Sequence, residues 1–308
     1  MKSFDVTILG EIYIDHVLSG FPVWPQPGEE VFTEEYIQEV GGGAANTVCG
    51  LGRLGRTTRL LGCVGSSDLP WFQDRLAPFG VHTGDLRTVS GRSGVTISVS
   101  TRQDRSFFTY IGANSQLPGI LTEAGLVEEL RQSRHVHFAM PLLPATALHL
   151  LPELRAAGCT TSLDVGFQPL WLRDPESLLV CRDIDYFLPN EREAALLSGT
   201  DAADYLDFTA RVDLPRGILK LGPRGAAMAS GGRTWHVPSP DVPVVDTTGA
   251  GDAFDAGFID ALLDGAGPED CLRRACLCGG LCTAAPGALT GLPARDQIEN
   301  LYEQTYAS

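Results

Sequence analysis

The amino-acid sequence predicts an α/β fold in which helices cover both faces of a mostly parallel sheet, with a small extra β-sheet attached. Short apolar runs typical of buried strands alternate along the chain with segments of helical periodicity, which is characteristic of parallel sheets. Two pairs of segments interrupt this alternation and show the polarity pattern of a separate sheet. With 308 residues, the chain suits a single large domain, which we take as residues 1–308.

The elements of the main domain follow from these patterns. Apolar runs predict strands at residues 4–10, 57–65, 134–139, 160–165, 184–188 and 216–221. Helical patterns lie at residues 44–54, 122–132, 144–157 and 191–198, and three further helices are predicted at 251–264, 268–284 and 294–304.

The extra strands are expected at residues 12–19, 31–40, 93–101 and 105–111. The last two alternate polar and apolar residues about a turn at Gln103-Asp104, which predicts a hairpin with one face in water. We expect the other face to cover a pocket, so that residues 12–40 and 93–112 form a lid inserted in the domain. The alternatives are a plain β-extension or a contact between two copies of the chain, because an exposed sheet has to be covered.

Composition narrows the classes of function. The formal charge of −15 argues against a nucleic-acid binder, which needs a basic surface. We expect no membrane span, because no apolar run of about 18 residues occurs. The first residues lack the pattern of a signal peptide, so we expect a cytoplasmic protein.

Cysteine and histidine give no strong metal signal. The eight cysteines contain no CxxC pair and are expected to be reduced, including the group Cys271, Cys276, Cys278 and Cys282. His135 and His137 share one face of a predicted strand. No third ligand lies near them in the sequence, so we expect neutral core histidines rather than a metal pair.

The most specific motif is DTTGAGDAFDAGF, which begins at Asp246 where a strand should end. Gly249, Ala250 and Gly251 lead into a helix, and amides at a helix N-terminus form an anion hole suited to a phosphoryl group. Asp252 at its mouth has the chemistry of a base that accepts the proton of an attacking hydroxyl. The alternative is that Asp252 is a helix N-cap.

The motif GGGAAN, residues 41–46, marks another strand-to-helix junction. Gly42 and Gly43 permit close approach of the main chain, and the Asn46 amide suits sugar hydroxyls. Asp15 follows the first strand and can accept hydrogen bonds from two vicinal hydroxyls. A surface aspartate at a strand end is the alternative for Asp15. GGGAAN is not a complete dinucleotide fingerprint, and no Walker A motif is present.

Two further strand ends carry polar residues. Asn190 and Glu193 lie three residues apart at a helix start, where they can hold a hydrated Mg²⁺ near phosphates or act as a helix cap. Residues 220–225, KLGPRG, place Lys220, Gly222 and Gly225 where they can line a nucleotide, or form a tight hairpin turn.

Taken together, these motifs resemble the ribokinase-like (PfkB) carbohydrate kinase family over nearly the whole chain. The resemblance implies the ribokinase-like three-layer α/β/α sandwich, with Asp252 as base and residues 249–251 as the anion hole. It implies that Asn190 and Glu193 organise Mg²⁺ and phosphate, with Glu193 acting through water. It also implies sugar contacts from Asp15, Gly42, Gly43, Asn46 and Asn114, and the cofactors ATP and Mg²⁺. Asp246 and Thr248, facing residues 286–288, match a loop that binds a monovalent cation such as K⁺ in some members.

The sequence departs from the family pattern at three places. Residues 162–168 lack the Asn and Arg of the Asp-x-Asn-x-Arg motif found in many members. Cys276 stands where an Asn often lies near adenine. Gly43 replaces the basic residue of members that act on phosphosugars, which favours an uncharged substrate, although Arg102 and Arg105 in the lid leave a phosphosugar open.

The sequence therefore predicts an ATP-dependent kinase that phosphorylates a hydroxyl of a ribose- or fructose-like, unphosphorylated sugar. A nucleoside kinase of the same family is the alternative, because Phe107, Phe108 and Tyr110 could form an aromatic clamp for a base. A non-catalytic ligand-binding member is disfavoured by the intact Asp252 and anion hole.

Overall fold

A computed structural model describes residues 2–101 and 105–306. Its central sheet is parallel, with the strand order β11-β10-β9-β1-β4. A bridge between Asn190 and Lys220 continues the parallel pairing from the end of β11 to β12, which belongs to the antiparallel sheet β12-β13-β14. The strands of these sheets are β1 (Phe4–Gly10), β4 (Thr58–Leu61), β9 (Ser133–Ala139), β10 (Thr160–Leu163), β11 (Tyr186–Phe187), β12 (Gly217–Lys220), β13 (Ala226–Ser230) and β14 (Arg233–Val237).

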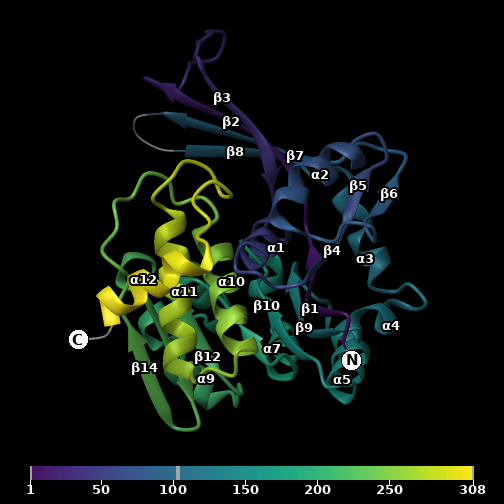
Figure 1. Ribbon diagram of the computed structural model, residues 1–308, viewed down its shortest axis with the longest axis vertical. Helices are drawn as coiled ribbons and strands as arrows, with labels where there is room; N and C mark the ends of the chain where they lie inside the picture. The colour runs from purple at the N-terminus through teal and green to yellow at the C-terminus, as the bar shows by residue number, and fades with distance from the viewer. Residues whose placement is uncertain (1, 102–104, 307–308) are drawn as a thin grey trace.

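Helices cover both faces of the central sheet, as the alternation of β1 shows. Val6 and Ile8 pack in one apolar cluster with residues of α1 and α10, whereas Leu9 packs in another with residues of α5 and α7. Two-residue alternation along a strand sends successive side chains to opposite faces, so the three-layer fold is confirmed. On the first side lie α1 (Gly43–Arg53), α2 (Leu69–Leu76) and α10 (Ala250–Leu263), with α11 (Pro268–Cys282) against α10 and α12 (Arg295–Tyr306) against α11 (Figure 1). Residues of the remaining helices belong to or pack against the other cluster: α3 (Leu117–Ile120), α4 (Leu126–Leu130), α5 (Pro144–Ala156), α6 (Pro169–Leu172), α7 (Ser177–Asp183), α8 (Glu191–Ser198) and α9 (Tyr205–Arg211).

A four-stranded sheet projects from this body (Figure 1). It consists of β2 (Tyr13–Phe21), β3 (Glu35–Gly41), β7 (Gly94–Thr101) and β8 (Arg105–Tyr110), in the order β3-β2-β7-β8. The pairs β2–β3 and β7–β8 are antiparallel, and β2–β7 is parallel. A separate small sheet in the predicted segments is therefore confirmed, including the hairpin of β7 and β8.

The expected orientation of this sheet was wrong. Ser98 and Ser100, on the polar face of β7, line a cavity, and so do Asp15 and Glu39 on the same face. The opposite face carries Tyr36, Ile97, Phe108 and Tyr110, which are 55%, 39%, 53% and 58% exposed. The polar face covers the cavity because it supplies the hydrogen-bonding groups there. On the apolar face Trp24 stacks on Phe108, and the four residues named remain exposed.

Two predicted elements differ in extent. The strand predicted at 57–65 is two strands, β4 and β5 (Cys63–Gly65), and β5 pairs with β6 (Arg87–Val89) in a different sheet. The predicted strand is interrupted at Gly62. This glycine packs so closely on Gly10 and Ile12 that a β-carbon would lie 2.5 Å from the Ile12 side chain. The helix predicted at 122–132 is confined to α4, because Gly125 in a left-handed conformation (φ 95°) precedes it. Across the described residues, no helix combines the length and apolar character required to cross a membrane.

Candidate active site

The N-terminal turns of α1 and α10 meet at Asp252. The Asn46 Nδ2 group on α1 donates a 2.7 Å hydrogen bond to Asp252 Oδ2, and the Thr47 hydroxyl donates to the Asp252 main-chain oxygen at 3.4 Å. Asn46 is buried, and its Oδ1 has no hydrogen-bond partner in the described part of the chain. The structure thus joins Asn46 and Asp252, two residues 206 positions apart, in one polar group.

The three glycines of residues 41–43 leave room around the two candidate carboxylates. A β-carbon at Gly41 would overlap the Asp15 carboxylate, and one at Gly43 would lie 3.4 Å from Asp252 Oδ1. Gly42 has φ 94°, and a β-carbon there would overlap the main-chain oxygen of Glu11. The space at Gly43 also means that any side chain at this position would lie against Asp252.

The start of α10 has the geometry expected of an anion hole. Gly249 is the N-cap, with φ 74°, and a β-carbon there would lie 2.6 Å from that of Ala288. Ala250 begins the helix, and Gly251 is exposed. The open N-terminus of a fourteen-residue helix attracts negative charge through its main-chain amides.

Burial and like charges raise the pKa of both candidate carboxylates. Burial, followed by the charge of Asp164, raises the pKa of Asp252 to about 6, against the lowering effects of the Asn46 hydrogen bond and Lys220. Burial, followed by the charge of Asp252, raises the pKa of Asp15 to about 7. An acid with a pKa of about 6 is largely ionised at neutral pH and still binds a proton readily, which suits a general base.

Lys220 lies inside a group of carboxylates next to Asp252. Its Nζ atom is 2.6 Å from Asp164 Oδ2 and 2.7 Å from Asp255 Oδ1. One carboxylate oxygen from each of Asp164, Asp252 and Asp255 lies within 4.8 Å of the others, a spacing that a metal ion could bridge. Here the buried ammonium supplies positive charge to the group.

Asp164 and Asp255 differ in their protonation state. Burial raises the pKa of Asp164, but the charge of Lys220 and the hydrogen bonds with Asp255, Lys220 and the Gly166 N–H together lower it to about 2. Burial raises the pKa of Asp255 well above its usual range. The group is therefore best described as an ionised Asp164, a protonated Asp255 and the Lys220 ammonium between them.

Asn190 and Glu193 form a reciprocal cap at the start of α8. The Asn190 main-chain N–H and Nδ2 donate to the two Glu193 carboxylate oxygens at 2.9 and 2.6 Å, and the Glu193 N–H donates to Asn190 Oδ1 at 3.0 Å. Burial and the charge of Asp164 raise the pKa of Glu193 to about 7. The helix-cap interpretation is therefore correct for both residues, and a role with Mg²⁺ stays a prediction.

The segment KLGPRG forms the turn of the β12–β13 hairpin. Gly222 and Gly225 both have positive φ, and a β-carbon at Gly225 would overlap the main-chain oxygen of Val237. The hairpin interpretation therefore describes the segment, while contacts of Gly222 and Gly225 with a nucleotide stay predictions. The Lys220 side chain, in contrast, bonds the carboxylates beside Asp252.

The loop before α10 is tied to the loop that follows α11. Asp246 Oδ1 accepts from the Thr248 N–H at 2.9 Å and hydroxyl at 2.7 Å, and Asp246 Oδ2 accepts from the Gly287 N–H at 3.0 Å. Residues 286–288 thus face Asp246 as predicted. Binding of a monovalent cation between the loops stays a prediction.

A cavity of about 560 Å³ lies between the polar face of the projecting sheet and these loops. Asp15, Glu39, Ser98 and Phe107 line it from the sheet, and residues 244–248 and 286–290 line it from the body. Phe108 and Tyr110 pair with Ile97 and Val95 on the other face of the sheet, so only Phe107 of the three predicted aromatic residues lines it. Arg102 and the side chain of Arg105 lie outside the described part of the structure.

Asn114 lies at the base of the projecting sheet. Its Oδ1 accepts from the Ile12 N–H at 3.1 Å, and its Nδ2 donates to the Ile12 oxygen at 2.8 Å. The side chain is buried, so the contacts seen here fix the segment that leads into β2 and Asp15. Direct contact between Asn114 and substrate stays a prediction.

Comparison with known proteins decides the family. The family model described as "pfkB family carbohydrate kinase" matches residues 4–295. The chain belongs to the pfkB family of carbohydrate kinases. It is 28% identical to a ribokinase of Haemophilus influenzae over 308 residues, covering 97% of this chain and 98% of the relative. This pfkB kinase is thus a phosphotransferase with an alcohol group as acceptor, acting on a sugar or nucleoside.

Solved structures share the fold over almost the whole chain. Arabidopsis thaliana ribokinase, complexed with ribose and ATP, has a TM-score of 0.84 at 24% identity, with 97% of this chain and 99% of that one covered. A Burkholderia thailandensis nucleoside kinase in complex with inosine has a TM-score of 0.82 at 21% identity, with 98% and 99% covered. These likenesses confirm the ribokinase-like fold.

Two residues of the pfkB kinase site were missed from the sequence. Asp255 lies one turn after Asp252 on α10 and is fully buried, and Asp164 directly follows the last residue of β10. The signal for Asp255 was available, because an aspartate three residues after the base shares its helix face. Asp164 was noted only for the missing Asn and Arg after it.

The histidines and cysteines are core residues. His135 and His137 are fully buried, and both contact the Ser162 hydroxyl at 2.7 Å. Burial lowers the pKa of His135 to about 3 and that of His137 to about 4, so both are neutral as predicted. All eight cysteines are buried and free, which agrees with the expectation of reduced thiols.

Proposed function

We propose that the protein transfers the γ-phosphoryl group of ATP to a hydroxyl of an unphosphorylated sugar, with Asp252 as the base. The observation that carries this proposal is the Asp252 carboxylate at the open N-terminus of α10, held by Asn46 and close enough to Asp15 to raise its pKa. Asp252 would accept the hydroxyl proton as the oxygen attacks phosphorus, and the amides after Gly249 would bind the transferred group. We propose that this activity takes place in the cytoplasm, where ATP is supplied.

The decisive test is a panel of free sugars, sugar phosphates and nucleosides assayed for ATP turnover. We expect an unphosphorylated polyhydroxyl compound to give much higher kcat/KM than any sugar phosphate, because the described cavity lining carries carboxylates and no basic side chain. A sugar phosphate as best substrate would contradict the proposal. If ATP turned over but no compound on the panel was phosphorylated, only ATP hydrolysis would remain. That result would also contradict the proposal.

Mg²⁺ fits the residues at the start of α8. Glu193 is buried and the nearby Asp164 is partly buried, and carboxylate oxygens suit Mg²⁺. Burial, followed by the charge of Asp164, raises the pKa of Glu193. Because both Glu193 oxygens already accept hydrogen bonds from Asn190, we propose that Glu193 holds the ion through water. When bound, Mg²⁺ would neutralise phosphate charge. Asp246 with Thr248 would hold K⁺ in the same proposal.

The Glu193→Gln variant is expected to need about 10-fold or more Mg²⁺ for half-maximal activity, by the scale of outer-shell effects on metal affinity. The amide cannot supply the negative charge that favours a hydrated cation. The measurement is a Mg²⁺ titration of the rate at fixed ATP, with Glu191→Gln as control, because Glu191 lies in the same helical turn but pairs with Arg224. An unchanged Mg²⁺ requirement would leave Glu193 with its capping role alone.

A nucleoside is the second candidate substrate. Phe107 lines the cavity, and an aromatic ring there could stack on a base. Phe108 stacks instead on Trp24, at 6.0 Å between ring centroids, on the other face of the sheet. A clamp made of several aromatic residues is therefore not formed by the described residues, which favours the sugar.

We propose that the projecting sheet closes over the cavity as a lid when the acceptor binds. Closure would exclude water, which otherwise competes for the phosphoryl group. Hydrogen exchange measured with and without acceptor is expected to show increased protection of residues 94–101 and 106–110, with little change in β1. Equal exchange in both states would indicate a rigid extension.

The apolar face of this sheet is proposed to pair with a second copy of the chain. Tyr36, Ile97 and Phe108 are exposed on it, and Trp24 stacks on Phe108. A contiguous exposed apolar surface of this kind marks an interface. Concentration-dependent protection of residues 94–101 without ligand would support a homodimer, and sedimentation as a monomer at all concentrations would contradict it.

A further inference from the structure

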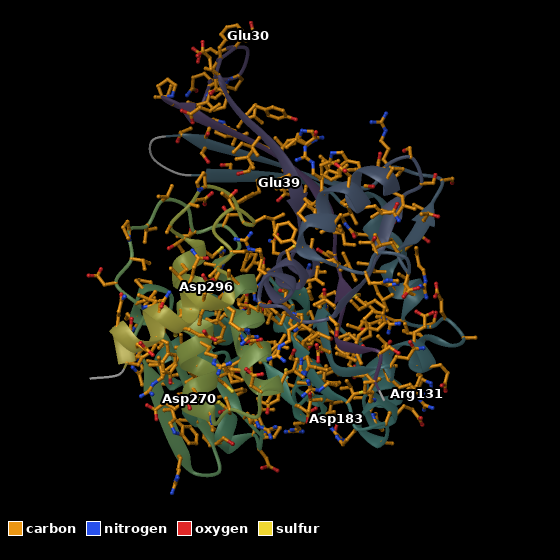
Figure 2. The ribbon with its side chains drawn as sticks, viewed as in Figure 1. Glu30, Glu39, Arg131, Asp183, Asp270 and Asp296 are labelled. Carbon is orange, nitrogen blue, oxygen red and sulfur yellow. The ribbon has the colours of Figure 1, made fainter. Side chains whose placement is uncertain are left out.

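Two carboxylates face each other at the base of the projecting sheet. The β2–β3 register places Asp15 directly opposite Glu39, and both side chains line the cavity. Figure 2 shows Glu39 near the lower end of β3, where the sheet joins the body. Like charges directly opposite on antiparallel strands destabilise a sheet, so this pair lowers the stability of the sheet when no ligand is bound.

The described lining of the cavity contains no positive side chain to offset this pair. Asp15, Glu35, Glu39 and Asp246 are its charged members. Glu35 accepts a hydrogen bond from Ser19 at 2.7 Å, and Asp246 accepts from Thr248 and Gly287. Asp15 Oδ1, in contrast, has no hydrogen-bond partner in the described structure. The charge of Glu39 also contributes to the raised pKa of Asp15.

A second observation is an unpartnered acceptor beside Asp252, whose charge also acts on Asp15. Asn46 is 5% exposed, its Nδ2 is committed to Asp252, and its Oδ1 lacks a partner among the described residues. Asp15, Glu39 and the Asn46 oxygen therefore all offer acceptors. A ligand that complements them is rich in donors and positively charged, since a charged donor forms the stronger bond to a carboxylate.

We propose that the acceptor substrate carries a protonated amino group, as in an amino sugar or aminocyclitol, and that Asp15 and Glu39 bind it. This inference rests on the proposed kinase function and specifies its substrate class. One carboxylate is enough to bind two hydroxyls of a neutral sugar, whereas the second carboxylate opposite adds repulsion that a neutral ligand does not offset. An ammonium group offsets both charges and has three N–H donors.

The chemistry at Asp252 is unaffected by the amino group. The hydroxyl oxygen forms the new bond to the γ-phosphorus, its proton passes to Asp252, and the bond from that phosphorus to the β-phosphate oxygen breaks to release ADP. The ammonium nitrogen has no free electron pair while it is protonated. It therefore orients the substrate and is not itself phosphorylated.

The test compares matched pairs of acceptors: fructose with 1-amino-1-deoxyfructose, glucose with glucosamine, and ribose with an aminodeoxyribose. We expect the wild type to prefer the amino compound in at least one pair by about 10-fold or more in kcat/KM, the scale of a hydrogen bond to a charged group. The Glu39→Gln variant should lose about 10- to 100-fold for that amino compound. The loss on the neutral partner should be smaller, so the ratio of kcat/KM for the amino compound to that for the neutral partner should fall by about 10-fold or more. The control is Glu30→Gln, which removes a carboxylate of the same segment at the far tip of the sheet (Figure 2).

Binding provides a readout that does not need turnover. Calorimetry of the same pairs on the Asp252→Asn protein should show the amino preference, and adding Glu39→Gln should remove it. Preference for the neutral sugar in every pair, or equal losses for both members in Glu39→Gln, would overturn the inference while leaving the kinase function standing. If the wild type phosphorylated no acceptor, the kinase proposal would fail, and the binding preference would still decide the inference.

Discussion

Replacing Asp252 by Asn is expected to lower kcat by about 10²- to 10⁴-fold, the usual contribution of a general base. The amide keeps the shape of the carboxylate and can keep a hydrogen bond with Asn46, but it cannot accept the hydroxyl proton. Because the anion hole is made of main-chain amides, ATP affinity should remain almost unchanged. The measurement combines steady-state kinetics with the dissociation constant for ATP.

The Asn46→Ala variant provides a comparison for this result. It removes the hydrogen bond that holds Asp252 and lowers its pKa, while leaving the base in place. We therefore expect a smaller loss of kcat than for Asp252→Asn. If Asp252→Asn retained activity within about tenfold of the wild type, the assignment of the base would be wrong.

The pH profile of kcat/KM should report the same group. A base must be ionised to accept a proton, so activity is expected to fall as the pH decreases through about 6, the pKa of Asp252. Loss of the Asn46 hydrogen bond raises that pKa. The acid limb should therefore move to higher pH in Asn46→Ala, a shift that a purely structural defect would not produce.

The parts of the site that could be predicted from sequence are those set by local geometry. Gly249 is the N-cap of α10 and Asp252 lies in its first turn, and such a run of residues determines its own conformation. The strand predicted to end at Asp246 is not formed, because β14 ends at Val237 and no strand follows it before α10. GGGAAN was equally local in character. Its three glycines nevertheless act on distant groups, because Gly41 makes room for Asp15 and Gly43 for Asp252. These contacts between the glycines and the two aspartates depend on how the strands pair. The spacing of residues in the sequence does not predict that pairing.

The orientation of the projecting sheet could not be derived from alternation alone. A period of two shows that β7 has a polar face with Ser98 and an apolar face with Ile97, but either face can cover a cavity. We assigned the apolar face to the pocket because apolar surface usually avoids water. The structure does the reverse, since the cavity requires polar groups. Ile97 remains 39% exposed.

The ion group around Lys220 was also beyond reach from sequence. Asp164, Lys220 and Asp255 come from three elements separated by 56 and 35 positions, and only tertiary packing brings them together. Lys220 had been assigned to the nucleotide because it precedes glycines in KLGPRG. Its ammonium instead bonds two carboxylates, so its expected effect is on folding and on the ionisation of Asp252.

The Lys220→Met variant is expected to lose about 3–5 kcal/mol of unfolding free energy, the usual cost of removing one partner of a buried ion pair. Methionine fills a similar volume but leaves the Asp164 charge buried without compensation. Because Lys220 lowers the pKa of Asp252, its loss should also move the acid limb of the activity profile above pH 6. Urea unfolding and the pH profile of the folded variant measure the two effects.

Two further variants separate charge from packing. Lys220→Met with Asp164→Asn removes both charges of the pair, and we expect it to regain much of the lost stability because no unpaired charge remains. Arg224→Met breaks the exposed pair with Glu191 and should cost less than about 1 kcal/mol. A Lys220→Met protein as stable as the Arg224→Met control would show that Asp164 takes up a proton at little cost. In that case the ammonium would not be needed to hold the carboxylates beside Asp252.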